Sequence, residues 1–109
     1  MLASAQITVR DSVQRDLWLA LIRLRVLQHA SQGPIFGLGI IEGLGVHGLQ
    51  VSAGTLYPML HSMEKSGLLH SRHEKIDSHF RRVYRATPLG RRVLKGTKAK
   101  VRELVGDLF

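Results

Sequence analysis

Cysteine is absent from this sequence, aromatic residues make up only 6% of it, and eight acidic residues stand against sixteen Lys and Arg. Without cysteine the chain has no disulfides, zinc–thiolate sites or cysteine nucleophile. The most apolar stretch, residues 17–27, is too short to span a bilayer and contains Arg23 and Arg25. No long apolar run follows Met1, so we expect no secretory signal, no membrane partner and a cytoplasmic location.

Few residues suit catalysis or cofactor binding. The eight carboxylates form no recognisable constellation with His or Ser, so the chain is not expected to be an enzyme. The closest histidine cluster is His70, His73 and His79, but positions 70 and 73 of one strand point to opposite faces. The glycine pairs at 37/39 and 43/45 follow no strand, which argues against a dinucleotide loop. We therefore expect neither a metal nor another cofactor.

Positive charge is concentrated in the second half of the chain. The formal net charge is +8, and residues 51–109 hold twelve basic and five acidic side chains, a net of +7. The field of such a charge attracts phosphates at long range. The distribution favours a polyanionic partner for this half, although solubility alone is the simpler reading of the charge.

A chain of 109 residues suits one domain with a modest core. Apolar residues recur at helical spacing in four segments, and two short runs separated by polar residues are typical of a β-hairpin. The predicted helices cover residues 16–32, 35–42, 53–66 and 88–109, and the predicted strands cover 68–74 and 81–87. The sequence thus predicts a mainly α fold with a small hairpin, in which the second and third helices form a helix-turn-helix and the hairpin is a wing.

Residues that start or stop helices support these boundaries. Gly33-Pro34 ends the first helix, and the glycine-rich segment 43–48 ends the second. Ser52 is suited to cap the third helix and Gly67 to terminate it. Thr87-Pro88 places an N-cap and a first-turn proline at the start of the last helix.

The segment from Ser52 to Leu69 carries the most specific pattern. It reads Ser-Ala-Gly-Thr-Leu-Tyr-Pro-Met-Leu-His-Ser-Met-Glu-Lys-Ser-Gly-Leu-Leu. Polar residues at its N-terminal end and an apolar face behind them are what a helix entering the major groove needs. Pro58 should lie near the first turn or bend the helix. The pattern resembles the recognition helix of PadR-type regulators, and residues 33–37 and 81–90 agree with that family in order and distance.

This resemblance implies a winged-helix fold, a dimer formed through the C-terminal helix, and repression relieved by a small molecule or a stress signal. It divides the chain into an N-terminal arm (1–15), a winged-helix DNA-binding domain (16–87) and a dimerisation helix (88–109). The chain departs from the family pattern at residues 36–39, where a second aromatic is usual, and at residues 77–79, where the wing tip lacks Gly or Pro.

Two sets of residues are candidates for function. The first set faces DNA, with polar side chains of the recognition helix at base edges and wing cations at phosphates. We expect it to read a palindromic double-stranded operator and to contain Ser52, Thr55, Tyr57, His61, Lys65, Arg72, Lys75, Arg81 and Arg82.

The second set is apolar and lies on the first and last helices, whose combined apolar surface exceeds what one small core covers. We expect it to form a homodimer and to hold a small planar apolar effector. Its residues are Trp18, Ile22, Val93, Val101, Leu104 and Leu108.

Two other functions remain open at this stage. RNA is an alternative polyanion, although the stacking aromatics of an RRM-type surface are absent. A winged helix used only for protein contacts is the other alternative, because a fold alone does not determine function.

Overall fold

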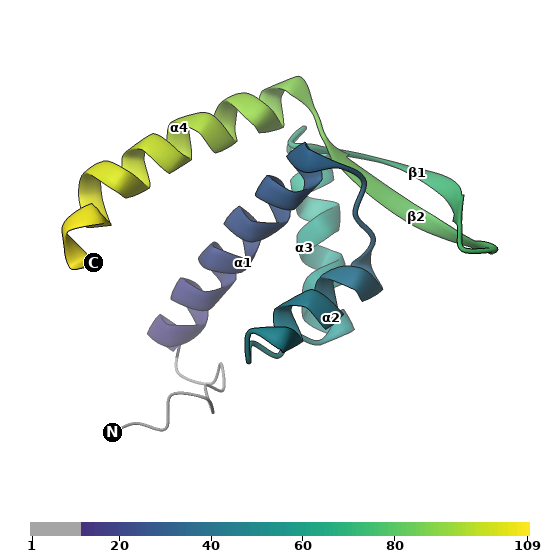
Figure 1. The fold of residues 1–109 in the computed structure, drawn as a ribbon, viewed down its shortest axis with the longest axis horizontal. Coiled ribbons are helices and arrows are strands. Elements are labelled where there is room, and N and C mark those ends of the chain that lie inside the picture. Colours follow the sequence, from purple (N-terminus) through teal and green to yellow (C-terminus); the bar gives the residue numbers. More distant parts are fainter. Residues whose placement is uncertain (1–11) are drawn as a thin grey trace.

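The computed structural model describes residues 12–109. Three helices, α1 (Ser12–Gln32), α2 (Gly37–Val46) and α3 (Ala53–Lys65), are followed by the strands β1 (Leu69–Ile76) and β2 (His79–Ala86), helix α4 (Pro88–Val105) and a 3-10 turn (Gly106–Leu108). Figure 1 shows the hairpin projecting to one side of α1–α3 and α4 extending to the other. The expected mainly α fold with a hairpin wing is confirmed. No helix within residues 12–109 is long and apolar enough to cross a membrane.

Helix boundaries differ from the sequence prediction at α1, at α2 and at the end of α4, which stops at Val105 and is followed by a 3-10 turn because Gly106 disfavours continuation of the helix. Helix α1 begins at Ser12, so the last residues of the expected N-terminal arm are helical, and the rest of that arm lies outside the described residues. Helix α2 begins later than expected because Ile35 is extended and exchanges backbone hydrogen bonds with Tyr84, at 2.9 and 2.7 Å. It also continues through Gly43 and Gly45, since burial of Leu44 in the core favours helix despite the glycines.

The hairpin is longer than predicted and its turn is shorter. Strands β1 and β2 pair antiparallel from Leu69 with Ala86 out to Ile76 with His79. Only Asp77 and Ser78 form the turn, with φ of 52° and 69°, the left-handed conformation that a two-residue hairpin turn requires. The polar residues 75–80 were predicted to be a connection, but a wing exposed on both sides accepts polar residues within its strands.

The predicted caps are confirmed. Ser52 is the N-cap of α3, and Gly67 follows that helix with a φ of +82°. Thr87 caps α4, with its Oγ1 accepting a hydrogen bond from the Gly90 amide at 2.9 Å, and Pro88 occupies the first turn. Pro58 lies inside α3, which continues to Lys65.

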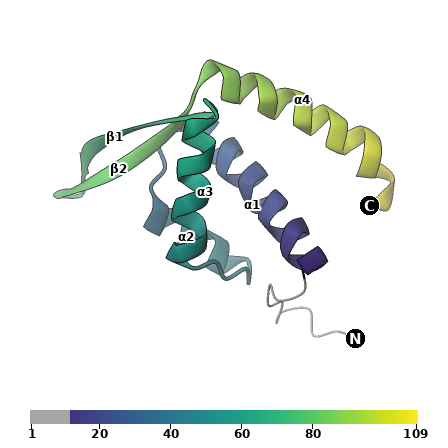
Figure 2. The same cartoon turned by 180° about the vertical axis from the view of Figure 1, so that it is seen from behind.

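The core lies where α1, α2, α3, the base of the hairpin and the start of α4 meet (Figure 2). Burial of these apolar side chains, at about 25 cal/mol per Å² of surface, is the main stabilising contribution. The largest fully buried side chains are Tyr84, Ile22, Leu56, Leu60, Leu69, Val26 and Val83.

Helix α4 crosses the start of the hairpin at a point where only glycine fits. A Cβ at Gly90 would lie 2.2 Å from the carbonyl oxygen of Leu68, a backbone atom that cannot turn away. The same Leu68 carbonyl accepts a hydrogen bond from the Thr87 amide at 3.0 Å. This bond keeps the start of α4 close to Leu68.

We predict that Gly90→Ala destabilises the fold by about 1–3 kcal/mol, because the methyl group forces α4 off the Leu68 carbonyl. The matched control is Gly96→Ala on the same helix, where a Cβ meets nothing within 4 Å. Because alanine has a higher helix propensity than glycine, this variant should be more stable by up to about 1 kcal/mol. Urea unfolding of both variants measures the difference, and equal stabilities would contradict the close approach.

Candidate nucleic-acid interface

The N-terminus of α3 is organised by Ser52 and Thr55. The Ser52 Oγ accepts a hydrogen bond from the Thr55 amide at 3.2 Å, and its hydroxyl lies 3.2 Å from Thr55 Oγ1. Ser52 is exposed and Thr55 partly so. The sequence predicted both as DNA contacts, and the structure places them together at the start of α3, where Ser52 is the N-cap.

Tyr57, His61 and Lys65 line up along the exposed side of α3, because they are spaced by four residues on one helix. With Pro58 and Ser62 they border a shallow open depression on the helix surface. The sequence predicted all three of the aligned residues as DNA contacts, and the structure brings them together on one stripe.

Tyr57 also packs against α2. A Cβ at Gly37 would lie 2.5 Å from the Tyr57 ring and its Oη, so the ring covers the first residue of α2. The side chain nevertheless remains 40% exposed. Tyr57 therefore connects the two helices of the helix-turn-helix and still presents part of its surface to solvent.

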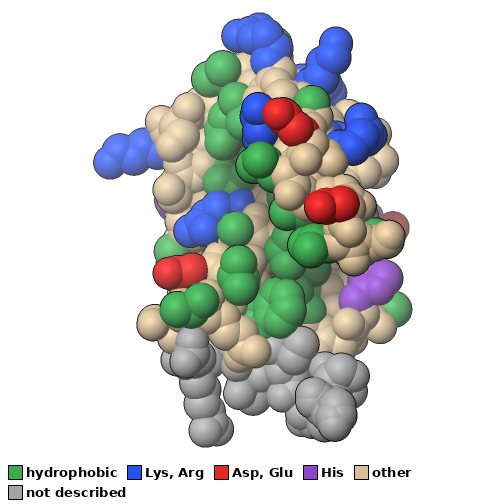
Figure 3. Space-filling view, turned by 90° about the vertical axis from the view of Figure 1, so that its left-hand side faces the viewer, with side chains coloured by type: hydrophobic (Ala, Val, Ile, Leu, Met, Phe, Trp, Pro, Cys, Tyr) green, Lys and Arg blue, Asp and Glu red, His purple; other side chains and the backbone are tan. Residues whose placement is uncertain are grey.

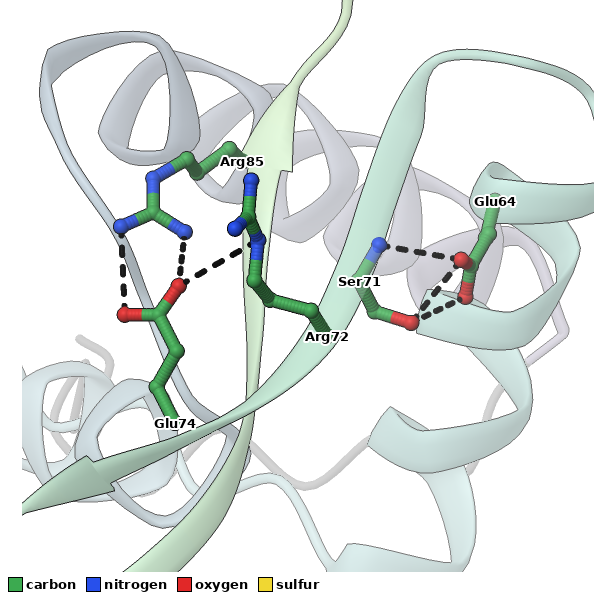
Figure 4. Close-up of polar contacts among 5 residues, drawn as sticks. All are labelled: Glu64, Ser71, Arg72, Glu74 and Arg85. Atoms are coloured by element: carbon green, nitrogen blue, oxygen red, sulfur yellow. Dashed lines mark hydrogen bonds and ion pairs between the residues drawn. The ribbon is translucent and has the colours of Figure 1, made fainter.

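Glu64, the only acidic residue of α3, does not contribute free negative charge to the exposed stripe. Its carboxylate accepts hydrogen bonds from the Ser71 amide at 3.0 Å and from the Ser71 hydroxyl at 2.9 Å, as Figure 4 shows. Arg82 Nη1 in turn donates to Ser71 Oγ at 2.9 Å. These bonds connect α3 to both strands of the wing.

The wing cations have different surroundings. Arg81 lies over the Phe36 ring, 4.6 Å from its centroid, so it joins the wing to the start of α2. Arg72 lies 3.6 Å from the Glu74 carboxylate, whereas Lys75 is exposed near the tip. The structure thus brings Arg82 toward α3 and Arg81 toward α2, and leaves Lys75 as an exposed cation close to the turn.

Glu74 is the main counter-charge on the wing. The hydrogen bond from Arg85 lowers the pKa of Glu74, and the same contact raises the pKa of Arg85 (Figure 4). Because the pKa of Glu74 is lower in the folded chain, its contribution to stability is present above the unfolded pKa and is lost as pH falls through the folded one. Glu74 is therefore ionised and engaged at neutral pH.

Comparison with known proteins decides the family. Residues 26–96 match the model of the "Transcriptional regulator PadR-like family". The chain is also 42% identical over 95 residues to the transcriptional regulator Rv3488 of Mycobacterium tuberculosis, covering 87% of this chain and 89% of the relative. The chain belongs to the PadR family.

Solved structures of PadR-family regulators have the same fold. A regulator from Eggerthella lenta is 30% identical with a TM-score of 0.69, covering 90% of each chain. A PadR-like regulator from Bacillus cereus reaches a TM-score of 0.78 at 23% identity, covering 85% of this chain and 92% of its own. This PadR-family chain is thus a transcriptional regulator with a winged-helix fold.

The predicted dimer residues of this PadR-family chain are mostly exposed. On α4, Leu104 and Leu108 are 67% and 74% exposed, and Val93 and Val101 are also open to solvent. Figure 3 shows hydrophobic side chains running in a band down the side of the molecule that carries α1 and α4. The Trp18 side chain is half-buried.

Ile22 differs from the other five predicted residues. Its side chain is only 2% exposed and belongs to the core of the single chain, so its face of α1 is already covered. The exposed apolar face of α1 carries Leu17 and Leu21 instead. The sequence did not single out Leu17 and Leu21 for an interface, and only the packing shows that they face solvent.

Sequence reasoning missed the contacts that hold the site together. Glu64, Ser71 and Phe36 were not predicted as site residues, yet they position the wing against α3 and α2. Glu64 could have been noticed because it belongs to the family-like pattern of residues 52–69. That Ser71 is its partner could not be predicted without the register of the hairpin.

We predict that Glu64→Ala loosens the wing, because the Ser71 amide loses its acceptor, at a cost of about 1–3 kcal/mol. Hydrogen exchange at the Ser71 amide, with urea unfolding of the whole chain, measures the effect. Glu103→Ala is the control, since the Glu103 carboxylate lies on α4 and pairs with Lys100. Unchanged exchange at Ser71 would contradict the role given to Glu64.

Proposed function

We propose that this regulator is a homodimer that binds a palindromic operator in double-stranded DNA and acts as a repressor. In this proposal α3 enters the major groove and the wing reaches the flanking phosphates. The observation that carries the proposal is the exposed stripe of Tyr57, His61 and Lys65, beside a wing on whose strands the one acidic residue, Glu74, is engaged by Arg85. The second carboxylate of the wing, that of Asp77, lies in its turn.

The charge pattern supports DNA over other partners. Glu64 is turned to Ser71, so the exposed stripe of α3 presents polar and basic side chains without a competing carboxylate. Lys75 and Arg82 add cations on the exposed wing. Phosphate contacts position such a domain, and helix side chains read base edges. Arg81 stays among the proposed phosphate contacts, with its stacking on Phe36 as a second role.

The apolar band supports the homodimer. Leu17 and Leu21 on α1 and Leu104 and Leu108 on α4 are all more than half exposed. Large exposed apolar patches mark protein interfaces, and a two-fold partner covers the same patch on both copies.

Release by a small molecule or a stress signal completes the proposal. Among the described residues, the shielded Trp18 Nε1 has no hydrogen-bond partner. A buried donor without a partner is unfavourable. In this proposal a planar apolar effector lies at the dimer face beside the half-buried Trp18 side chain.

We predict that His61→Ala weakens binding to the operator by about 1–3 kcal/mol while leaving binding to random DNA nearly unchanged, because a base-edge contact is lost. Lys75→Ala should weaken both about equally and lower the slope of log affinity against log salt by about 0.9. Lys98→Ala, on α4, is the charge-matched control. The operator is first selected from genomic fragments, with half-sites expected about 10 base pairs apart or a multiple of that.

Two results would overturn DNA binding as the function. One is a flat salt response of the wild-type chain, and the other is a preference for RNA of matched length over every selected DNA fragment. Recovery of a protein partner with no DNA would favour the protein-contact alternative.

We predict that the purified chain has twice the 12.2 kDa mass of one copy by light scattering. Leu21→Asp should shift it to the mass of one copy at micromolar concentration, because a carboxylate is then buried in the apolar interface. Leu38→Asp is the control, since Leu38 is 46% exposed but lies on α2. A monomeric wild type, or equal masses for the two variants, would contradict this interface.

A further inference from the structure

Phe80 is a large apolar side chain that the core of this chain does not use. It lies on β2, one residue pair inside the pair that borders the turn, and it is 76% exposed. It takes no part in the hydrophobic core, and the tip of the hairpin lies well away from the three helices α1–α3 (Figure 1). Burial of a phenylalanine stabilises a fold strongly, so packing within the single chain does not explain an aromatic residue at this place.

The register of the hairpin surrounds Phe80 with basic side chains. Its cross-strand partner is Lys75, and two residues further toward the base of the wing His73 is paired with Arg82. Because side chains alternate between the two faces of a strand, all four of these residues share one face. Arg82 is held on that face by its hydrogen bond to Ser71 Oγ, at 2.9 Å.

The carboxylates of the wing do not share this face. Glu74 belongs to the opposite face, where Arg85 binds it, and Asp77 lies in the turn. An aromatic side chain among cations suits a surface with phosphates at its rim and stacked bases inside, which describes a groove of double-stranded DNA. It suits a protein partner less well, because charged residues are depleted at the centre of protein interfaces.

The dimensions of the hairpin favour the minor groove. Paired strands lie about 4.8 Å apart, and the minor groove is about 6 Å wide, so only the tip of a two-stranded wing can approach its floor. Phe80 lies next to that tip. Apolar side chains that enter the minor groove part neighbouring base pairs and kink the duplex by about 20–90°. Pyrimidine–purine steps are the most easily unstacked.

We propose that Phe80 inserts into the minor groove beside each half-site, partly unstacks a pyrimidine–purine step and bends the operator. Lys75 and Arg82 bind the phosphates on either side of the inserted ring. The inference rests on the proposed function, because α3 must hold the DNA for the wing to reach it. It adds a second source of specificity: Phe80 selects DNA that deforms easily, at a position where the protein makes no hydrogen bond to a base.

The test uses the full-length protein and the operator selected from genomic fragments. One set of duplexes carries a donor and an acceptor dye at its two ends, and a second set carries 2-aminopurine at single positions beside each half-site. We expect the wild type to bend the duplex and to raise 2-aminopurine fluorescence severalfold at one step per half-site, because an unstacked base is less quenched. Phe80→Ser should lose both signals.

Affinity separates the ring from the cations beside it. Phe80→Ser should bind the operator about tenfold more weakly, the loss typical of one contact between an aromatic ring and a base. Its slope of log affinity against log salt should be unchanged, since no phosphate contact is removed. Replacing the unstacked step of the operator by a stiff A-tract should weaken binding of the wild type severalfold and binding of Phe80→Ser much less.

Two variants serve as controls. Phe80→Leu keeps an apolar side chain that can enter a base step, and it should restore most of the bend and of the fluorescence signal. Phe109→Ser removes an aromatic residue that is 98% exposed but lies outside the wing, and it should behave as the wild type does. Thermal unfolding verifies that each variant is folded.

Three outcomes overturn the inference. The first is operator binding by the wild type without a bend or an unstacked step, and the second is a wild-type signal in Phe80→Ser, which leaves the ring free for a protein partner. The third is a lower mass of Phe80→Ser by light scattering, which places Phe80 between two copies of the chain. In these cases operator binding by the wild type persists and the proposed function stands, whereas a wild type that binds no selected DNA overturns both.

Discussion

The backbone bonds between Ile35 and Tyr84 are the constraint on which the arrangement of this domain depends. They attach the segment between α1 and α2 to the second strand of the wing. Tyr84 is fully buried, which raises the pKa of its hydroxyl, so this junction also belongs to the core. With this pairing in place, Phe36 comes to lie under Arg81, and α2 starts at the one residue over which Tyr57 packs.

A second feature of the domain is the way acidic residues are used. Glu64 is drawn to Ser71 at the base of the wing, and Glu74 is drawn to Arg85 along it. Each carboxylate organises the wing and is removed from the surface charge at the same time. The concentration of basic charge in the second half of the sequence therefore becomes a surface property of the recognition helix and wing, which is the basis of the proposed phosphate contacts.

Glycine matters at two positions of helix α2. At its start, Gly37 allows the Tyr57 ring to approach the backbone, and further along Gly43 borders an open cavity beside α1. From the sequence, the glycine-rich segment that starts at Gly43 was predicted to end the helix. In the structure Gly37 and Gly43 both lie inside α2, and Gly37 is the residue on which the Tyr57 ring of α3 packs.

Much of the fold could be predicted from the sequence. The caps Ser52 and Thr87, the terminator Gly67 and the helical spacing of α3 and α4 are local signals, and local hydrogen bonding and periodicity produce what they indicate. The family-like pattern of residues 52–69 likewise predicted the helix α3 and, on it, the polar residues proposed to contact DNA. Family membership followed from residues that are close together in the chain.

Contacts between distant segments were decided only by the tertiary structure. The start of α2 depends on the Ile35–Tyr84 pairing. The burial of Ile22 depends on which face of α1 packs against the rest of the core. The stacking of Arg81 depends on the fold bringing Phe36 next to it. The sequence determined which residues are apolar, charged or capable of capping, because these are properties of single side chains and near neighbours. It did not determine which apolar stripe is covered or which arginine is engaged, because those depend on the packing of elements far apart in the chain.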